Sequence, residues 1–258
     1  GLAGFIGGIQ SSKAHLKTKE IDFFNDIQQL AAQVLINAQL TDGSWLSTNQ
    51  MLSNLTGWSH GSSGIAAALA VVRQHADQQL AAAIDEAINT AVKHELKHIT
   101  PAGDWIDLRT KRNDPSKVNG IGQSWCHGAP GSLLAAVVLH RCKIPFTPEI
   151  RKWTELAIDS TKRAKPRSDS LCCGQAGLIL IEEIAAAEFK RPELQEQAQE
   201  RRLLLQRKTF GQGFNLGPYF PLTYNAPGLF DGIAGIALSL RFRGSDSKIQ
   251  TLLSLGML

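Results

Sequence analysis

A chain of 258 residues with 43% apolar side chains is long enough to bury a hydrophobic core, and its net charge of +4 identifies no partner. Its apolar runs are shorter than the roughly 18 residues that a membrane-spanning helix needs, and no basic stretch interleaved with aromatic residues indicates nucleic acid. With no secretory signal at its start, the chain's four cysteines favour a reducing compartment, so we expect a cytoplasmic protein.

Glycine motifs punctuate the chain, and each precedes a short apolar helix that is followed by a longer amphipathic one. Turn residues and prolines mark the ends of these segments. The predicted helices are, in chain order, a glycine-led helix from Gly1, then residues 17–40, 65–75, 78–98, 132–141, 148–163, 178–189, 192–208, 236–242 and a short terminal helix.

These helix pairs form an internal repeat. The first glycines of the five motifs, Gly1, Gly61, Gly128, Gly174 and Gly232, lie 60, 67, 46 and 58 residues apart. A helix that is apolar on all sides is buried, whereas an amphipathic helix faces solvent on one side. The pattern therefore predicts an all-α fold, an α/α toroid with inner glycine-led helices and outer amphipathic ones. The motifs at the starts of the inner helices should converge near the axis.

Three of the four cysteines directly precede a glycine motif. They lie in Ser124-Trp125-Cys126-His127-Gly128 and in Leu171-Cys172-Cys173-Gly174. Thiols that a repeat brings together at neighbouring helix starts are suited to hold zinc, and we predict a metal centre formed by Cys126, Cys172 and Cys173. Buried thiols or a disulfide are the alternatives, although a disulfide between adjacent cysteines would be strained.

The motifs, in this order and spacing, resemble the LanC-like lanthipeptide cyclases over nearly the whole chain. His127 and the segment Trp105-Ile106-Asp107 look most like the C-terminal cyclase domain of class II (LanM-type) synthetases. The resemblance implies an α/α toroid of seven helix pairs, five of which are found here. Residues 1–258 are therefore expected to be a partial cyclase domain, without the N-terminal repeats and the dehydratase domain that is covalently linked to it in such enzymes.

The function implied by the resemblance belongs to lanthipeptide antibiotic biosynthesis. Such cyclases use Zn²⁺ to add cysteine thiolates to dehydroalanine or dehydrobutyrine, which forms lanthionine or methyllanthionine thioether rings. The expected partner is a ribosomally made precursor peptide with a dehydrated core and a leader peptide. Neither nucleic acid nor a membrane is expected as a partner.

The resemblance also implies roles for single residues. Cys126 and Cys172 match the first two zinc ligands, and Cys173 stands where the family usually has a histidine, as in a minority of class II enzymes with three thiolates. His60 matches a histidine near the metal that acts as an acid or base. For His127 we expect either stabilisation of an enolate oxygen or a structural place behind the metal ligands.

A competing motif lies at the end of the predicted helix 78–98. His94-Glu95-Leu96-Lys97-His98 fits the H-E-x-x-H pattern of zinc metalloproteases. However, Glu95 falls on the apolar stripe of this helix, and Pro101 follows closely, which favours an ordinary outer helix. A further alternative is a non-catalytic, zinc-stabilised LanC-like module that binds peptides or thiols.

Charged residues flank the cysteine motifs. Asp107 and Arg109 either pair beside the site or only fix the connection between two helix pairs. The basic residues Lys162, Arg163, Lys165 and Arg167 either attract an acidic leader peptide or belong to a solvated loop.

Overall fold

The computed structural model describes residues 1–258 except 48–53, 110–119, 210, 212 and 218–225. The described part is mainly helical and contains a two-stranded antiparallel sheet. The elements are α1 (Leu2–Ser12), η1 (Lys13–His15), α2 (Thr18–Asn37), α3 (Ser62–Arg73), α4 (Gln78–Lys97), β1 (Ile106–Asp107), β2 (Gly120–Ile121), α6 (Ala129–Arg141), α7 (Pro148–Arg163), α8 (Gln175–Phe189), α9 (Pro192–Thr209), α10 (Ile233–Arg241) and α11 (Ser247–Leu253).

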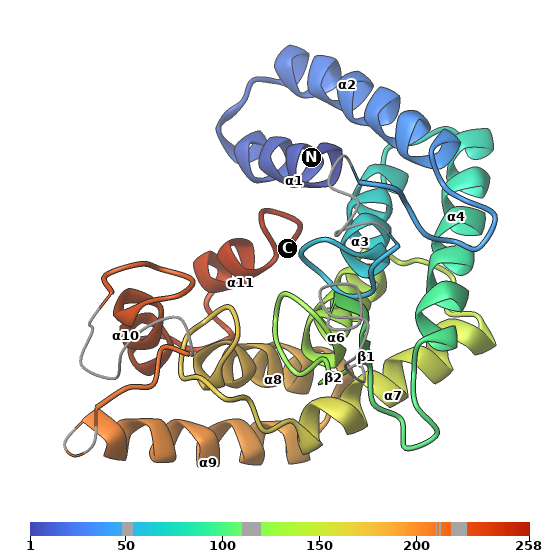
Figure 1. The fold of residues 1–258 in the computed structure, drawn as a ribbon. Coiled ribbons are helices and arrows are strands. Elements are labelled where there is room, and N and C mark those ends of the chain that lie inside the picture. Colours follow the sequence, from blue (N-terminus) through green and yellow to red (C-terminus); the bar gives the residue numbers. More distant parts are fainter. Residues whose placement is uncertain (48–53, 110–119, 210, 212, 218–225) are drawn as a thin grey trace.

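The helices form two layers along a curved path (Figure 1). In the inner layer α1 packs on α3, α3 on α6, α6 on α8 and α8 on α10. The longer helices α2, α4, α7 and α9 each pack on the outside of the inner helix that precedes them. All residues of α6 from Ala129 to Leu139 are buried, whereas α7 buries one stripe that includes Trp153. The predicted division into inner and outer helices is confirmed.

The inner helices begin earlier than the sequence predicted. They start at Ser62, Ala129, Gln175 and Ile233, so the second glycine of each motif lies in the first helical turn and not before it. At Gly131 a Cβ would collide with the carbonyl oxygen of Trp125, six residues earlier. The same contact recurs at Gly64, Gly177 and Gly235. Glycine therefore lets the incoming loop fold back onto the helix that it starts.

These glycines also receive the loop of the preceding repeat. A Cβ at Gly131 would lie 2.7 Å from the Cβ of Trp58, and one at Gly235 would lie 2.8 Å from the Cβ of Leu171. Each motif loop thus rests on the first turn of the next inner helix. This stacking places the loops of successive repeats side by side, where the candidate site residues are.

The C-terminal segment packs inside the curve. Trp125 donates its indole N–H to the carbonyl oxygen of Leu253 at 2.9 Å, and Gly7 of α1 contacts the backbone of Leu255. Figure 1 shows α11 and the C-terminus next to α1. Helix α1 also exposes apolar side chains, since Leu2 and Phe5 are 39% and 49% exposed. Within the described residues, no helix has the length and apolar character required to cross a membrane.

Candidate metal centre

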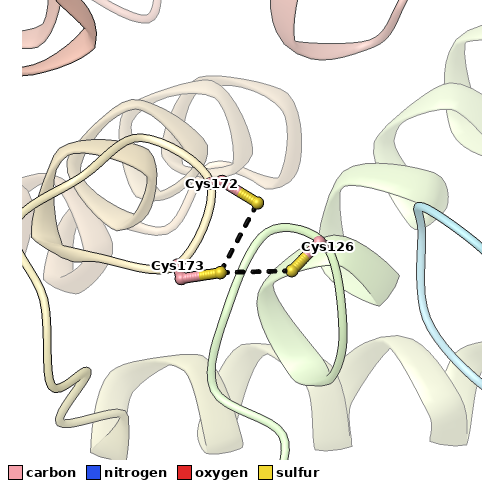
Figure 2. A group of neighbouring side chains, drawn as sticks. All are labelled: Cys126, Cys172 and Cys173. Carbon is pink, nitrogen blue, oxygen red and sulfur yellow. Dashed lines mark hydrogen bonds between the residues drawn. The ribbon is translucent and has the colours of Figure 1, made fainter. Parts of the chain in front are cut away.

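Three thiols from two neighbouring repeats meet at one point (Figure 2). The Sγ atom of Cys173 lies 3.5 Å from that of Cys126 and 3.5 Å from that of Cys172, and all three sulfur atoms lie within 4.8 Å of one another. Sulfur ligands of a tetrahedral zinc ion, at about 2.3 Å from the metal, are separated by about 3.8 Å. The sulfur triangle therefore fits one face of a zinc tetrahedron, and in the described part of the chain no other such group of three ligands occurs.

Backbone and hydroxyl hydrogen bonds hold the two cysteine loops. Ser124 Oγ lies 3.4 Å from Cys126 Sγ and donates to the carbonyl oxygen of His127 at 3.1 Å, which closes the turn before α6. The backbone N–H of Cys173 donates to Ser170 Oγ at 3.3 Å, and that of Cys172 donates to the carbonyl oxygen of Phe230 at 2.8 Å. The fifth repeat therefore supports the loop that carries two of the three thiols.

The three thiols do not lose their protons equally. Hydrogen bonds from Cys172 and Cys173 lower the pKa of the Cys126 thiol far below its usual value, despite burial. The hydrogen bonds with Cys126, together with burial, raise the pKa of Cys172 and of Cys173. Three thiols this close therefore resist ionising together. Ionisation of all three sulfur atoms requires positive charge at their centre, which is what a divalent metal provides.

Two histidines lie beside the thiols. His127 follows Cys126 and is buried, and its ring stacks on that of His60 with the centroids 5.8 Å apart. Burial lowers the pKa of His127, and the neighbouring thiolate of Cys126 only partly opposes this shift. His60 is exposed and lines a cavity of about 600 Å³, together with Trp45 and Trp58. His127 beside Cys126 thus contacts an imidazole, His60, that borders a largely apolar cavity.

The pairing of β1 with β2 brings the segment with Asp107 and Arg109 beside the Cys126 loop, because Gly122 after β2 contacts His127 and Gly128. Asp107 of β1 lies opposite Gly120 of β2, and the backbone N–H of Gly122 donates to the carbonyl oxygen of Trp105 at 2.8 Å. Arg109 donates two hydrogen bonds to the carboxylate of Asp107, from Nε to Oδ1 at 2.9 Å and from Nη2 to Oδ2 at 2.7 Å. The sequence left open whether Asp107 and Arg109 pair beside the site or only fix the connection between two helix pairs, and the structure supports the pair.

The competing H-E-x-x-H motif is buried in the helix packing. Glu95 is 1% exposed and lies between α4, the start of α3, the start of α6 and the segment before β1. Its carboxylate accepts six hydrogen bonds, from Gly57 N–H, Ser62 Oγ, Ser63 N–H and Oγ, Trp105 Nε1 and Ser132 Oγ. A carboxylate engaged on both oxygens is a structural link between repeats, and this arrangement argues against a role as the base of a protease.

Sequence reasoning missed this structural role of Glu95 and gave no role to Asp231. The carboxylate of Asp231, just before α10, is among the charges that raise the pKa of Cys173. Its position in the motif could have identified it as a site residue. Asp231 directly precedes Gly232, just as His60 precedes Gly61 and Cys173 precedes Gly174. The side chains of the site thus come from the one or two residues before the first glycine of each motif.

Comparison with known proteins bears on the family and the fold. A family model described as lanthionine synthetase C-like protein matches residues 1–253. Among solved structures, the chain is similar to nisin cyclase, with a TM-score of 0.69 and 18% sequence identity over 97% of this chain. The chain spans 65% of the length of that protein. The similarity confirms the predicted α/α toroid. No curated protein matches the chain.

Proposed function

This chain belongs to the lanthionine synthetase C-like protein family, and from that premise we propose that it acts as a zinc-dependent lanthipeptide cyclase domain. The observation that carries the proposal is the convergence of Cys126, Cys172 and Cys173 from two repeats within 4.8 Å. The Trp-Cys-His-Gly motif around Cys126 supports the class II (LanM-type) form, with a linked dehydratase domain and a leader peptide as expected partners of the full-length enzyme.

The three thiolates are suited to take three of four tetrahedral positions and to leave the fourth for a cysteine of the peptide. When held by these three cysteines, zinc would supply the positive charge that keeps the peptide sulfur as a thiolate at neutral pH. Because the protein supplies three thiolates and no histidine, the peptide thiolate should be held loosely and stay nucleophilic. The predicted reactivity of this variant depends on Cys173.

The two histidines are suited to the proton transfer that follows attack. The peptide sulfur forms a bond to the β carbon of the dehydro residue, and the electrons of the broken π bond move onto the carbonyl oxygen as an enolate. His60 then delivers a proton to the α carbon and regains one from solvent, which has taken up the proton that the peptide thiol released on ionising, so no proton is gained or lost overall. His60 is exposed on the cavity, whereas His127 is buried and suited to orient His60 or to hold the enolate oxygen.

The proposal is tested with a dehydrated peptide that carries one cysteine. Cyclisation leaves the peptide mass unchanged and removes its free thiol, so treatment with an alkylating reagent no longer adds mass. We expect the zinc-loaded chain to protect the peptide from alkylation and Cys126→Ala to lose this activity. Protection that is equal with and without the chain would contradict the proposal, and binding of the peptide without loss of its thiol would favour a non-catalytic module.

The role of the third thiolate has its own test. Cys173→His keeps three zinc ligands but replaces one thiolate by a neutral imidazole. If the extra thiolate makes the peptide sulfur more nucleophilic, Cys173→His should retain zinc and cyclise more slowly. Cyclisation at an unchanged or higher rate would show that Cys173 contributes only to binding of the metal.

A further inference from the structure

The candidate centre poses a problem of charge. Three protein thiolates and one Zn²⁺ carry a net charge of about −1, and a peptide thiolate as fourth ligand brings about one more negative charge. Cys126 is buried, Cys172 is half-buried and Cys173 is exposed, so water screens this charge only in part and a nearby cation lowers its cost. A neutral fourth ligand, such as water or imidazole, would avoid this cost. A thiolate is therefore favoured as fourth ligand only if a positive charge lies near the metal site.

The guanidinium group of Arg109 is placed to provide that positive charge. Gly122, which follows β2, packs directly against the backbone of His127 and Gly128, so the strand pair beside Asp107 and Arg109 adjoins the Cys126 loop. Burial disfavours the charged guanidinium, yet the bonds to Asp107 and the charges of Asp107, Cys126 and Cys173 outweigh burial and raise the pKa of Arg109. Arg109 is thus an electrostatic neighbour of two of the three thiols.

Asp107 holds this cation in place with both of its carboxylate oxygens. The charges of Cys126 and Cys173 act on Arg109. Burial, and with it the charge of Arg109, lowers the pKa of His127, which directly follows Cys126. Nε and Nη2 of Arg109 are both bonded to Asp107, while Nη1 makes no hydrogen bond to the described residues.

We propose that Arg109, oriented by Asp107, balances the charge of the three-cysteine centre and so selects an anionic sulfur as its fourth ligand. This inference rests on the proposed zinc site and assigns Arg109 as a positioning residue that acts through the metal ligands. It predicts that the arginine matters most when the third protein ligand is Cys173, because a histidine there would remove one negative charge.

The test measures ligand binding and not turnover. The chain is loaded with Co²⁺ as a spectroscopic probe, and 2-mercaptoethanol or imidazole is titrated while the absorption of the metal centre is followed. Loss of one nearby charge at an effective dielectric constant of about 20 should weaken thiol binding about tenfold in Arg109→Gln. Binding of neutral imidazole should change less than about twofold, because it adds no charge.

Three variants make the result specific. Arg163→Gln breaks another arginine–aspartate pair, with Asp104 at 2.7 Å, and should bind thiol like the parent. Arg109→Lys keeps the charge and should restore part of the affinity. In a Cys173→His background, the effect of Arg109→Gln should shrink. If Arg109→Gln fails to retain Co²⁺, Arg109→Lys must retain it, and loss of the metal from both overturns the inference.

Failure of the inference and failure of the proposed function are distinguishable. Unchanged thiol affinity in Arg109→Gln, or equal losses for thiol and imidazole, would overturn the role of Arg109 even if the parent cyclises peptides. Thiol binding that depends on Arg109 in a chain without cyclase activity would support this role and count against the proposed function.

Discussion

The imidazole rings of His60 and His127 stack with their centroids 5.8 Å apart and their planes 26° from parallel. The two side chains belong to the motif loops of neighbouring repeats, which are joined by a hydrogen bond from the backbone N–H of Ser59 to the carbonyl oxygen of Cys126 at 3.0 Å. His60 is exposed and His127 is buried, so His60 is the one that a peptide can reach.

Replacement of His60 should affect catalysis and not the metal. We expect His60→Asn to slow cyclisation by about 100-fold or more, which is typical for loss of a general acid, while zinc content stays at the level of the parent. Cyclisation is measured by protection of the peptide thiol from alkylation. His15→Asn, at an exposed histidine in η1, is the control. A His60→Asn chain that cyclises within twofold of the parent would exclude this role.

The cysteines should differ in their effect on metal content. We expect Cys126→Ala to lose most of the bound zinc, because two thiolates remain where three fit a tetrahedral site. Cys142→Ala removes a buried free thiol that accepts a hydrogen bond from Gln74 at 3.2 Å, and it should retain zinc. Metal is measured by elemental analysis after dialysis. Retained zinc in Cys126→Ala, combined with its loss in His98→Ala, would instead favour the protease motif.

The link made by Glu95 should be important for stability. Glu95→Ala leaves six buried donors without their acceptor, and we expect the free energy of unfolding to fall by about 3–5 kcal/mol. Glu86→Ala, on the exposed face of the same helix, should change it by less than about 0.5 kcal/mol. Denaturant unfolding followed by circular dichroism measures both. Equal stability of the two variants would show that the network contributes little.

The glycine in the first turn of α6 should not tolerate a side chain. Gly131→Ala places a methyl group against the carbonyl oxygen of Trp125 and the side chain of Trp58, and we expect a loss of about 1–3 kcal/mol together with weaker zinc binding. Gly8→Ala in α1 meets open space and should be neutral or stabilise the helix by up to about 1 kcal/mol. Thermal unfolding and zinc titration are the measurements. A neutral Gly131→Ala would mean that the loop can move aside.

The glycine repeat was sufficient to predict much of the fold and the meeting of the thiols. The spacing of the motifs identified the helix pairs, and the position of Cys126 and Cys172 before equivalent glycines placed them at neighbouring helix starts. The inner helices were predicted to start too late because the steric reason for the second glycine, contact with a carbonyl oxygen six residues earlier, appears only when the loop has folded back.

Other features depend on contacts between distant segments. Glu95 reads as a polar residue in an apolar stripe, and only the fold shows that Ser62, Trp105 and Ser132 converge on it. The relation of Arg109 to the thiols depends on the pairing of Asp107 with Gly120, thirteen positions away in the sequence. Two-residue strands carry too little pattern to be found from sequence alone.

The sulfur atoms of the candidate centre belong to two different repeats, with Cys126 before α6 and Cys172 and Cys173 before α8. A small rotation of one helix pair against the next changes the distance from Cys126 to Cys173 directly, whereas the distance between the two adjacent cysteines stays nearly constant. The distance between the sulfur atoms therefore depends on the angle between these two helix pairs. A bound metal ion would fix that angle, and a ligand that changes the angle would change the affinity for the metal.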